Sequence, residues 1–232
     1  MKAALVDVTT GDLVSDRHRF DTPRPASPAA MTATLQELVG SFDYSGPIGV
    51  GFPAVVEDGM VSTANNISRT WIGRNARSEF SAALGQDITL MNDADAAAVA
   101  EAQFGAARGV GGLVLMVTFG TGIGSGMLVD GQLVPNLELG VLELEGHTKG
   151  ETFFSAKARK EEGLSWEEWG DRANRFLLHV TRVFSPKLLV IGGGVVKRWE
   201  LFEERFDPAL PIELAAIRNN AGIVGAAVSS KG

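Results

Sequence analysis

The chain has 232 residues, enough for one large domain or two lobes, and it contains no cysteine, which excludes disulfide bonds and thiolate chemistry. Its formal net charge of −7 argues against a general nucleic-acid-binding protein. No apolar run is long enough to cross a membrane, and the first residues lack the apolar core of a signal peptide, so we expect a cytoplasmic protein without a membrane partner. The 28 glycines exceed ordinary usage, and we expect the excess in turns and ligand-binding loops.

The first half of the chain is predicted to combine short strands with two helices. The spacing of Met31, Leu35 and Leu38 predicts the first helix, and Asn92 and Asp93 are typical of the start of the second. The elements predicted here are strands at 3–8 and 13–20 forming a hairpin, a loop at 21–28, a helix at 29–42, strands at 47–51 and 88–91, and an alanine-rich helix from 92 to about 107.

The second half repeats this alternation. Asp130 and Gly131 predict a type I′ turn, and Ser165 followed three residues later by Glu168 predicts a capped helix start. The elements predicted here are strands at 113–119, 123–129 and 132–134, helices at about 152–162 and 166–184, a strand at 188–191, a short strand around 214–217 and a final helix from 221. No linker separates the halves, so the pattern predicts two α/β lobes.

A glycine-rich segment at 118–126, Thr-Phe-Gly-Thr-Gly-Ile-Gly-Ser-Gly, lies between two predicted strands and is therefore a hairpin loop. Alternate glycines let the backbone curl so that its N–H groups converge on an anion, and the Thr118 and Thr121 hydroxyls would add donors. The alternative is a bulged hairpin without a ligand, and we favour phosphate binding. Three further glycines at 192–194 follow a buried strand and would admit a nucleotide or polyphosphate chain, unless they only form a tight turn.

Carboxylates occur at two places where they could meet a ligand. Asp93 follows a strand, where it would point into the usual ligand crevice of an α/β lobe and could accept a proton from a hydroxyl. Helix capping by Asn92 and Asp93 explains the same residues equally well. Glu138 and Glu151 could accept hydrogen bonds from a hydroxyl-rich ligand, although surface acids in a loop are the simpler interpretation.

Basic residues gather at three places on this acidic chain. They could mark an anion-binding track, although exposed helix faces produce the same pattern. The groups are Arg69, Arg74 and Arg77; Lys157, Arg159 and Lys160; and Lys197 and Arg198.

Several motifs spread over almost the whole chain are specific in combination. They are Gly-Phe-Pro-Ala-Val-Val at 51–56, Asn-Ile at 66–67 with Trp-Ile-Gly at 71–73, Asn-Asp-Ala-Asp-Ala-Ala at 92–97, Gly-Thr-Gly-Ile-Gly-Ser at 120–125, Val-Pro-Asn at 134–136, Glu-Leu-Gly at 138–140, Leu-Ser-Trp-Glu-Glu-Trp at 164–169, Gly-Gly-Gly-Val at 192–195 and Ala-Gly-Ile-Val-Gly-Ala-Ala at 221–227. In combination they resemble the ROK family of bacterial sugar kinases. The stretch at 164–169 and the absence of cysteine resemble its polyphosphate-using glucokinase branch, because many other members carry a cysteine-rich zinc motif.

The resemblance implies an actin-like, ribonuclease-H-like ATPase fold with two α/β lobes and a central cleft. The N-terminal lobe would comprise 1–92 with the C-terminal helix at about 220–232, and the C-terminal lobe would comprise 93–219. The implied reaction is phosphoryl transfer from inorganic polyphosphate, and also from ATP, to the 6-hydroxyl of glucose. Mg²⁺ is expected with the donor, and a homodimer is expected.

The resemblance also assigns site residues by match to the family motifs. Asp93 would be the base that activates the 6-hydroxyl and would bind the sugar together with Asn66 and Asn92, while Glu138 and Glu151 would hold hydroxyls on the other side of the ring. The residues expected to bind phosphate are Thr118, Gly120, Thr121, Gly122, Gly124, Gly193 and Gly194. No residue is assigned as a metal ligand.

Two features depart from the family pattern. The match starts at the family's second strand, so the first strand and its Asp-x-Gly-Gly-Thr phosphate loop are expected to be absent, which would leave unpaired backbone groups and an apolar slot in the first lobe. Val141 stands where the family has a sugar-binding histidine, which predicts weaker or altered sugar selectivity, and His147 lies too far along to replace it.

Three explanations of the first departure stay open. Met1 could be an internal methionine of a longer protein, the chain could be a truncated paralogue that binds sugar or polyphosphate without transfer, or another chain could supply the strand. An ATP-dependent kinase for another hexose is a further alternative function.

Overall fold

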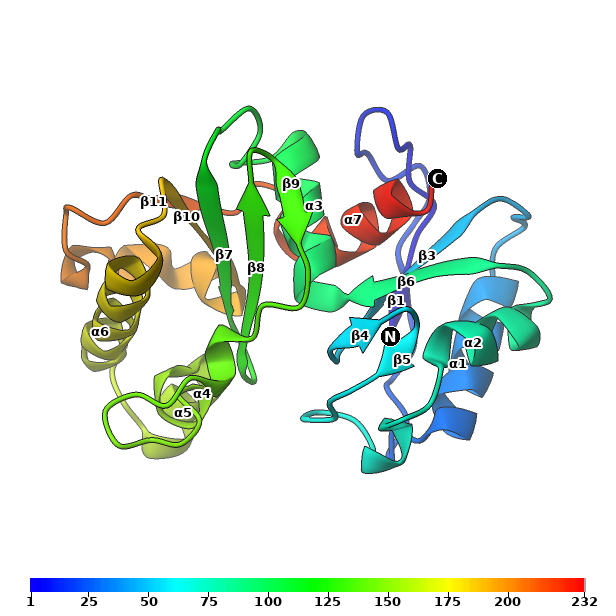
Figure 1. Ribbon diagram of the computed structural model, residues 1–232, viewed down its shortest axis with the longest axis horizontal. Helices are drawn as coiled ribbons and strands as arrows, with labels where there is room; N and C mark the ends of the chain where they lie inside the picture. The colour runs from blue at the N-terminus through cyan, green and yellow to red at the C-terminus, as the bar shows by residue number, and fades with distance from the viewer. Residues whose placement is uncertain (232) are drawn as a thin grey trace. The chain divides into compact units, whose positions relative to one another are not determined.

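The computed structural model describes residues 1–231, and the chain divides into two compact units (Figure 1). Unit 1 comprises Met1–Ala100 together with the C-terminal residues from Asn220 onward, and unit 2 comprises Glu101–Asn219. The chain therefore passes into unit 2 within helix α3 (Asp93–Phe104) and returns to unit 1 just before its last helix. Among the described residues, no helix is both long enough and apolar enough to span a lipid bilayer.

The strands of unit 1 form three separate two-stranded sheets. The pairs are β1 (Lys2–Ala3) antiparallel with β2 (His18–Arg19), β3 (Ile48–Phe52) parallel with β6 (Ile88–Asn92), and β4 (Val56–Glu57) antiparallel with β5 (Met60–Val61). Among the described residues, no strand joins the β1–β2 pair to the β3–β6 pair. Strand β3 is thus paired on one side only, and Ile48 and Val50 remain only partly buried.

The hairpin predicted at 3–8 and 13–20 forms only in part. Besides the β1–β2 pair, a single bridge joins Val6 and Leu13. Two residues separate Ala3 from Val6, but four separate Leu13 from His18, so the second segment bulges between the two pairings. The hydroxyl of Ser15 fills the bulge by accepting a hydrogen bond of 2.9 Å from the opposite backbone.

Unit 1 also contains a small aromatic core. The rings of Phe52, Trp71 and Phe80 make edge contacts with centroid separations of 5.1 to 6.0 Å. Helices α1 (Pro28–Gly40) and α2 (Ala76–Leu84) and the short η1 (Arg69–Trp71) surround this core. Helix α2, η1 and the β4–β5 hairpin were not predicted from the sequence, and η1 and the two strands are only two or three residues long.

Helix α7 (Ala221–Ser229) packs closely against β3 and against the start of α3. A Cβ atom at Gly49 would run into the backbone of Ala226, and one at Gly225 would run into the backbone of Ala96. Glycine at these two positions allows the direct backbone contact. The contact fixes the N-terminal turn of α3, which begins at Asp93.

Unit 2 contains one five-stranded sheet in the order β11-β10-β7-β8-β9. The strands are β7 (Leu113–Phe119), β8 (Ile123–Val129), β9 (Gln132–Val134), β10 (Leu188–Gly193) and β11 (Ile212–Leu214). Strand β10 runs parallel to β7 and β11, whereas β7, β8 and β9 form an antiparallel meander, drawn in green in Figure 1. Asp130 and Gly131 have φ values of 51° and 77°, which confirms the predicted type I′ turn.

The helices of unit 2 differ from the prediction at one point. The helix predicted at about 152–162 is broken into α4 (Glu151–Phe154) and α5 (Ala156–Glu162), because Ser155 takes an extended conformation and caps α5 through the N–H of Ala158 at 3.2 Å. The strand predicted around 214–217 lies instead at β11. The remaining short helices are η2 (Leu139–Val141), η3 (Gly194–Leu201), η4 (Glu203–Arg205) and η5 (Arg218–Asn220).

Helix α6 (Trp166–Phe184) forms the core of unit 2 with the sheet. Its buried face, which includes Trp169, Phe176 and Val180, packs with β7 and β10 residues such as Val117 and Ile191. The predicted capping box is present, because Ser165 accepts from the N–H of Glu168 at 3.1 Å while the Glu168 carboxylate accepts from the N–H of Ser165 at 2.8 Å. The strongly packed α6 gives unit 2 a rigid base for the loops at the end of β7 and β10.

Candidate active site

In unit 1, candidate residues lie where the parallel strands β3 and β6 end side by side. Phe52 and Asn92, the last residues of the two strands, are paired in register. The buried Asn92 caps α3, because its Oδ1 accepts from the N–H groups of Ala94 and Asp95 at 2.8 and 3.1 Å. Its Nδ2 donates to the carbonyl of Ala54 at 3.1 Å. Capping therefore accounts for the Asn92 oxygen, and one N–H of its amide group is left to donate to a ligand.

Asp93 follows at the first position of α3 and is exposed to solvent. Desolvation by the surrounding protein raises the pKa of its carboxyl above the ordinary aspartate value, although hydrogen bonds from the backbone N–H groups of Ala94 and Asp93 oppose the shift. A carboxyl that solvent reaches and whose pKa is raised suits a general base, because its carboxylate holds a proton more strongly than an ordinary aspartate does.

The other unit 1 candidates lie further along the chain. Asn66 is exposed in the loop between β5 and η1. In the first basic group, Arg74 pairs with Glu79 at 2.6 Å and Arg77 donates to the carbonyl of Ile88 at 3.0 Å. These two arginines therefore have structural partners, which agrees with the simpler interpretation rather than with an anion track.

In unit 2, the predicted phosphate-binding residues gather at one end of the sheet. The register pairs Gly192 with Thr118 and Gly193 with Phe119 between the parallel strands β10 and β7. Phe119 in turn pairs with Ile123 across the β7–β8 hairpin. The glycine-rich loop and the turn at Gly193 and Gly194 therefore lie next to each other at the carboxyl ends of β7 and β10, where α/β sheets commonly bind ligands.

The hairpin loop uses part of its own hydrogen-bonding capacity. The N–H of Gly120 donates to the carbonyl of Gly122 at 2.9 Å, and the Thr118 hydroxyl donates to the carbonyl of Gly124 at 3.3 Å. Gly120 and Gly122 do not take the left-handed conformation, so the loop does not use this freedom of glycine at these two positions. The N–H groups of Thr121 and Gly122 and the exposed Thr121 side chain remain the donors that a phosphate can reach.

Close packing affects two of these positions, and it requires glycine at one of them, Gly193. A Cβ atom at Gly193, whose φ is +87°, would run into the backbone of Phe119. A Cβ atom at Gly122 would run into the carboxylate of Glu151. Gly120 and Gly194 have open space around them, which leaves room for a ligand at the tips of both turns.

The two predicted sugar-binding glutamates flank the same hairpin. The Oε2 atom of the half-buried Glu151 accepts a hydrogen bond from the N–H of Ile123 at 3.2 Å. Glu138 immediately precedes η2 and is also half-buried. Gly140 in η2 packs against Ile123 and Glu151, so the structure brings the two acidic segments together.

Ser125 on β8 positions Glu138, and the sequence analysis did not single it out. Its buried hydroxyl donates to the carbonyl of Leu137 at 2.7 Å and accepts from the N–H of Leu139 at 2.8 Å. These are the residues on either side of Glu138. The only sequence signal was a serine facing inward between two glycines of a strand.

Val141 and His147 lie in different environments. Val141 is the last residue of η2 and is 38% exposed. The ring of His147 stacks on Phe153 with a centroid separation of 4.1 Å. His147 thus belongs to an aromatic cluster with Phe153 and Phe154.

The residues present suit a metal ion that arrives with the substrate better than a resident one. Within residues 1–231, no group of three or more histidine, cysteine, aspartate or glutamate side chains is placed to hold a metal. Magnesium in kinase sites is usually bound by one or two carboxylates together with phosphate oxygens and water. The described residues therefore leave such an ion to be held mainly by phosphate oxygens and water.

Comparison with known proteins identifies the family of the chain. The model of the ROK family matches residues 1–152. The chain is 41% identical over 231 residues to a polyphosphate glucokinase of Mycobacterium tuberculosis (strain CDC 1551 / Oshkosh), covering 99% of this chain and 87% of that protein. It is 39% identical to a polyphosphate glucokinase of Mycobacterium leprae (strain TN), of which it covers 71%.

A solved structure resembles almost the whole chain. The crystal structure of an inorganic polyphosphate/ATP-glucomannokinase from Arthrobacter sp. strain KM matches with a TM-score of 0.94 and 41% identity, covering 98% of this chain and 92% of that one. A ROK family glucokinase from Streptomyces griseus matches with a TM-score of 0.83 at 21% identity, which concerns the fold alone. The chain has the actin-like ATPase fold, and it belongs to the ROK family.

Proposed function

We propose that the protein transfers a phosphoryl group from inorganic polyphosphate, with ATP as a second donor, to the 6-hydroxyl of glucose, giving glucose 6-phosphate. The observation that carries this proposal is the 41% identity to a polyphosphate glucokinase over 99% of the chain. The geometry supports it with the exposed carboxyl of Asp93 in unit 1 and an exposed glycine-rich loop in unit 2.

Asp93 is proposed as the general base. Phosphoryl transfer needs little covalent chemistry from the protein, but the attacking hydroxyl must lose its proton and lie in line with the leaving group. The raised pKa of Asp93 makes its carboxylate a better proton acceptor than an ordinary aspartate. Asn92 would donate its remaining amide N–H to a sugar hydroxyl, and Asn66 would add a further hydrogen bond.

Glu138 and Glu151 are proposed to accept hydrogen bonds from hydroxyls elsewhere on the sugar ring. Carboxylates can each receive two such bonds, which suits a neutral polyol. Glu151 already holds the N–H of Ile123 through one oxygen, so its Oε1 is the atom we assign to the sugar.

The donor is assigned to the loop of unit 2. The N–H groups of Thr121 and Gly122, the Thr121 hydroxyl and the open turn at Gly194 would hold its phosphates. Mg²⁺, when bound with the donor, would neutralise phosphate charge, and the residues here leave it to be held largely by phosphate oxygens and water.

The test is direct. Purified protein with polyphosphate, Mg²⁺ and glucose should form glucose 6-phosphate, measured by a coupled dehydrogenase assay, and ATP and mannose should be compared as donor and acceptor. Absence of product with every combination would overturn the proposal.

A second candidate is a protein that binds sugar without transferring phosphate. Val141, exposed in η2 at the position of the family histidine, favours it. Calorimetry showing glucose binding without turnover on either donor would support this reading. Comparable KM values for glucose in the wild type and in Val141→His would show that the valine does not weaken sugar binding. The cytoplasmic compartment expected from the sequence and the homodimer expected from the resemblance remain predictions.

A further inference from the structure

The glycine-rich loop contains no cation. Residues 118–126 are threonine, phenylalanine, glycine, isoleucine and serine only. A polyphosphate chain carries roughly one negative charge per phosphate, and backbone N–H groups alone compensate this charge weakly compared with charge-assisted hydrogen bonds. A cationic side chain beside the loop would therefore add to the charge compensation that Mg²⁺ and the backbone N–H groups provide.

The main chain of Lys157 is hydrogen-bonded to this loop. Its main-chain N–H donates to the carbonyl of Gly120 at 3.0 Å. Gly120 lies at the exposed tip of the hairpin, with nothing within 4 Å of the position that a Cβ would occupy. The long flexible side chain of Lys157 thus starts beside the open space that we assign to the donor.

The ammonium group of Lys157 is available for a ligand. Its side chain is 54% exposed, and it faces Glu161 at 3.6 Å, whose side chain is 65% exposed. Such an exposed i,i+4 ion pair contributes little and is easily exchanged for a phosphate. Arg159 on the same helix already has intramolecular partners. It donates to the carbonyl of Leu164 at 2.8 Å, and its guanidinium carbon lies 3.9 Å from the centroid of the Trp166 ring.

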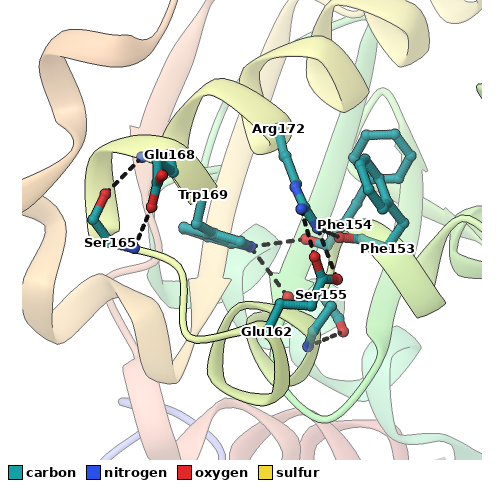
Figure 2. A network of polar contacts seen from close by, with 9 residues as sticks. Phe153, Phe154, Ser155, Glu162, Ser165, Glu168, Trp169 and Arg172 are labelled. Atoms are coloured by element: carbon teal, nitrogen blue, oxygen red, sulfur yellow. Dashed lines mark hydrogen bonds and ion pairs between the residues drawn. The ribbon is translucent and has the colours of Figure 1, made fainter.

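A network from α6 holds the segment that carries Lys157 (Figure 2). The Nε1 of Trp169 donates to the carbonyls of Phe154 and Ser155 at 3.0 and 3.1 Å. Arg172 stacks on Phe153 at 3.8 Å and forms a two-pronged pair with Glu162 at 2.9 and 2.6 Å. Contacts from α6 therefore hold the turn between α4 and α5 in place, and this turn positions Lys157 next to the loop.

We propose that Lys157 binds the phosphate chain of the donor at the rim of the glycine-rich hairpin. The inference rests on the proposed function and extends it, because it names the cation of the donor site. The ligand chemistry is a linear chain of phosphates, either inorganic polyphosphate or the triphosphate tail of a nucleotide. Trp169 and Arg172 act through the backbone of 153–155 and are positioning residues.

The experiment compares Lys157→Gln and Lys157→Arg with Lys160→Gln. Lys160 is an exposed lysine on the same short helix and serves as the matched control. Binding of long-chain polyphosphate, tripolyphosphate and ATP is measured by titration calorimetry at several salt concentrations, with glucose as a separate ligand and the thermal midpoint as a folding check. Initial rates with polyphosphate and glucose complete the set.

Lys157→Gln should weaken polyphosphate binding roughly threefold to tenfold. It should also reduce by about one the number of counterions released on polyphosphate binding, as measured by the slope of the logarithm of the binding constant against the logarithm of the salt concentration. Lys157→Arg should restore most of the affinity, and glucose binding and the thermal midpoint should stay unchanged. An equal effect on ATP would place the triphosphate tail at the same residue, whereas an effect on polyphosphate alone would assign Lys157 to the inorganic chain.

Wild-type affinity in Lys157→Gln, or an equal loss in Lys160→Gln, would overturn the inference. Failure to bind any of the phosphate chains in the wild type would overturn it as well. A wild type that binds polyphosphate through Lys157 but forms no glucose 6-phosphate would contradict the proposed function only, so the two failures are distinguishable.

Discussion

The main-chain N–H of Ile123 donates to Oε2 of Glu151 at 3.2 Å. This hydrogen bond joins a carboxylate proposed to bind sugar to the end of the hairpin proposed to bind phosphate. The two functions of unit 2 therefore share one local structure, and a change on either side of the bond is expected to disturb both.

Gly122→Ala tests this shared structure. The added methyl group would run into the Glu151 carboxylate, whose side chain can move away only by giving up the hydrogen bond from the N–H of Ile123, and we expect a loss of about 0.5–1.5 kcal/mol of unfolding free energy. Denaturant unfolding measures the loss. Gly120→Ala is the stability control, because its Cβ meets open space and should change the unfolding free energy by less than about 0.5 kcal/mol. Equal stabilities of the two variants would contradict the packing that we describe.

Ser125→Ala tests the placement of Glu138. The substitution removes the hydroxyl that bonds Leu137 and Leu139, leaving a buried N–H and carbonyl without this partner, at a cost of about 1–3 kcal/mol. Because Glu138 lies between these two residues, we expect KM for glucose to rise more than KM for polyphosphate. Steady-state kinetics with each substrate varied in turn provides the measurement, with the exposed Ser78→Ala as control. A selective rise in the polyphosphate KM would argue against this role of Ser125.

Much of unit 2 could be predicted from the sequence because its signals are local. The apolar runs of β7 and β8 and the Asp130-Gly131 turn determine their own boundaries, and the structure reproduces them. In unit 1 the signals are weaker. The Asp58-Gly59 pair, with φ values of 49° and 83°, closes the β4–β5 hairpin, but strands of two residues leave no periodic pattern to detect.

The candidate site was only partly predictable for a related reason. Motif residues such as Gly193 and Glu151 could be matched by type and spacing. The roles of Ser125 and Lys157 depend on contacts with segments 12 or more residues away, which no local pattern reveals. The bulge at Ser15, which shortens the first hairpin, arises in the same way from a mismatch between two paired segments.

Glu101 is a buried carboxylate with a structural task. It is completely buried, and it accepts hydrogen bonds from the N–H groups of Ala106, Ala216 and Ile217 at 2.8, 3.0 and 2.8 Å. Glu101→Gln would turn an amide NH₂ toward these donors, so we expect a loss of about 2–4 kcal/mol in unfolding free energy.

Urea denaturation checks this value, with the exposed Gln103→Ala on the same helix as control. A loss in Glu101→Gln no larger than that of the control would show that the three hydrogen bonds do not hold the end of α3 to the segment at 216–217.

The raised pKa of Asp93 makes the free energy of unfolding depend on pH. Its pKa is raised in the folded state by desolvation, so between the ordinary aspartate value and the raised value the folded state binds the proton more readily than the unfolded state does. The unfolding free energy contributed by this group therefore falls as pH rises through that window. Asp93→Asn cannot ionise, and its stability relative to the wild type should increase from about pH 4 to pH 7. A relative stability that decreases over this range would show that the carboxylate is favoured by folding.

Asp93 is proposed as the base of a phosphoryl transfer to glucose. The most direct measurement is the rate of glucose 6-phosphate formation from polyphosphate, Mg²⁺ and glucose by the wild type and by Asp93→Asn, with the exposed Asp87→Asn as the matched control. We expect Asp93→Asn to lower kcat by about 10²–10⁴-fold. Glucose binding should remain measurable and Asp87→Asn should stay at the wild-type rate. Turnover by Asp93→Asn at the wild-type rate would contradict the assignment.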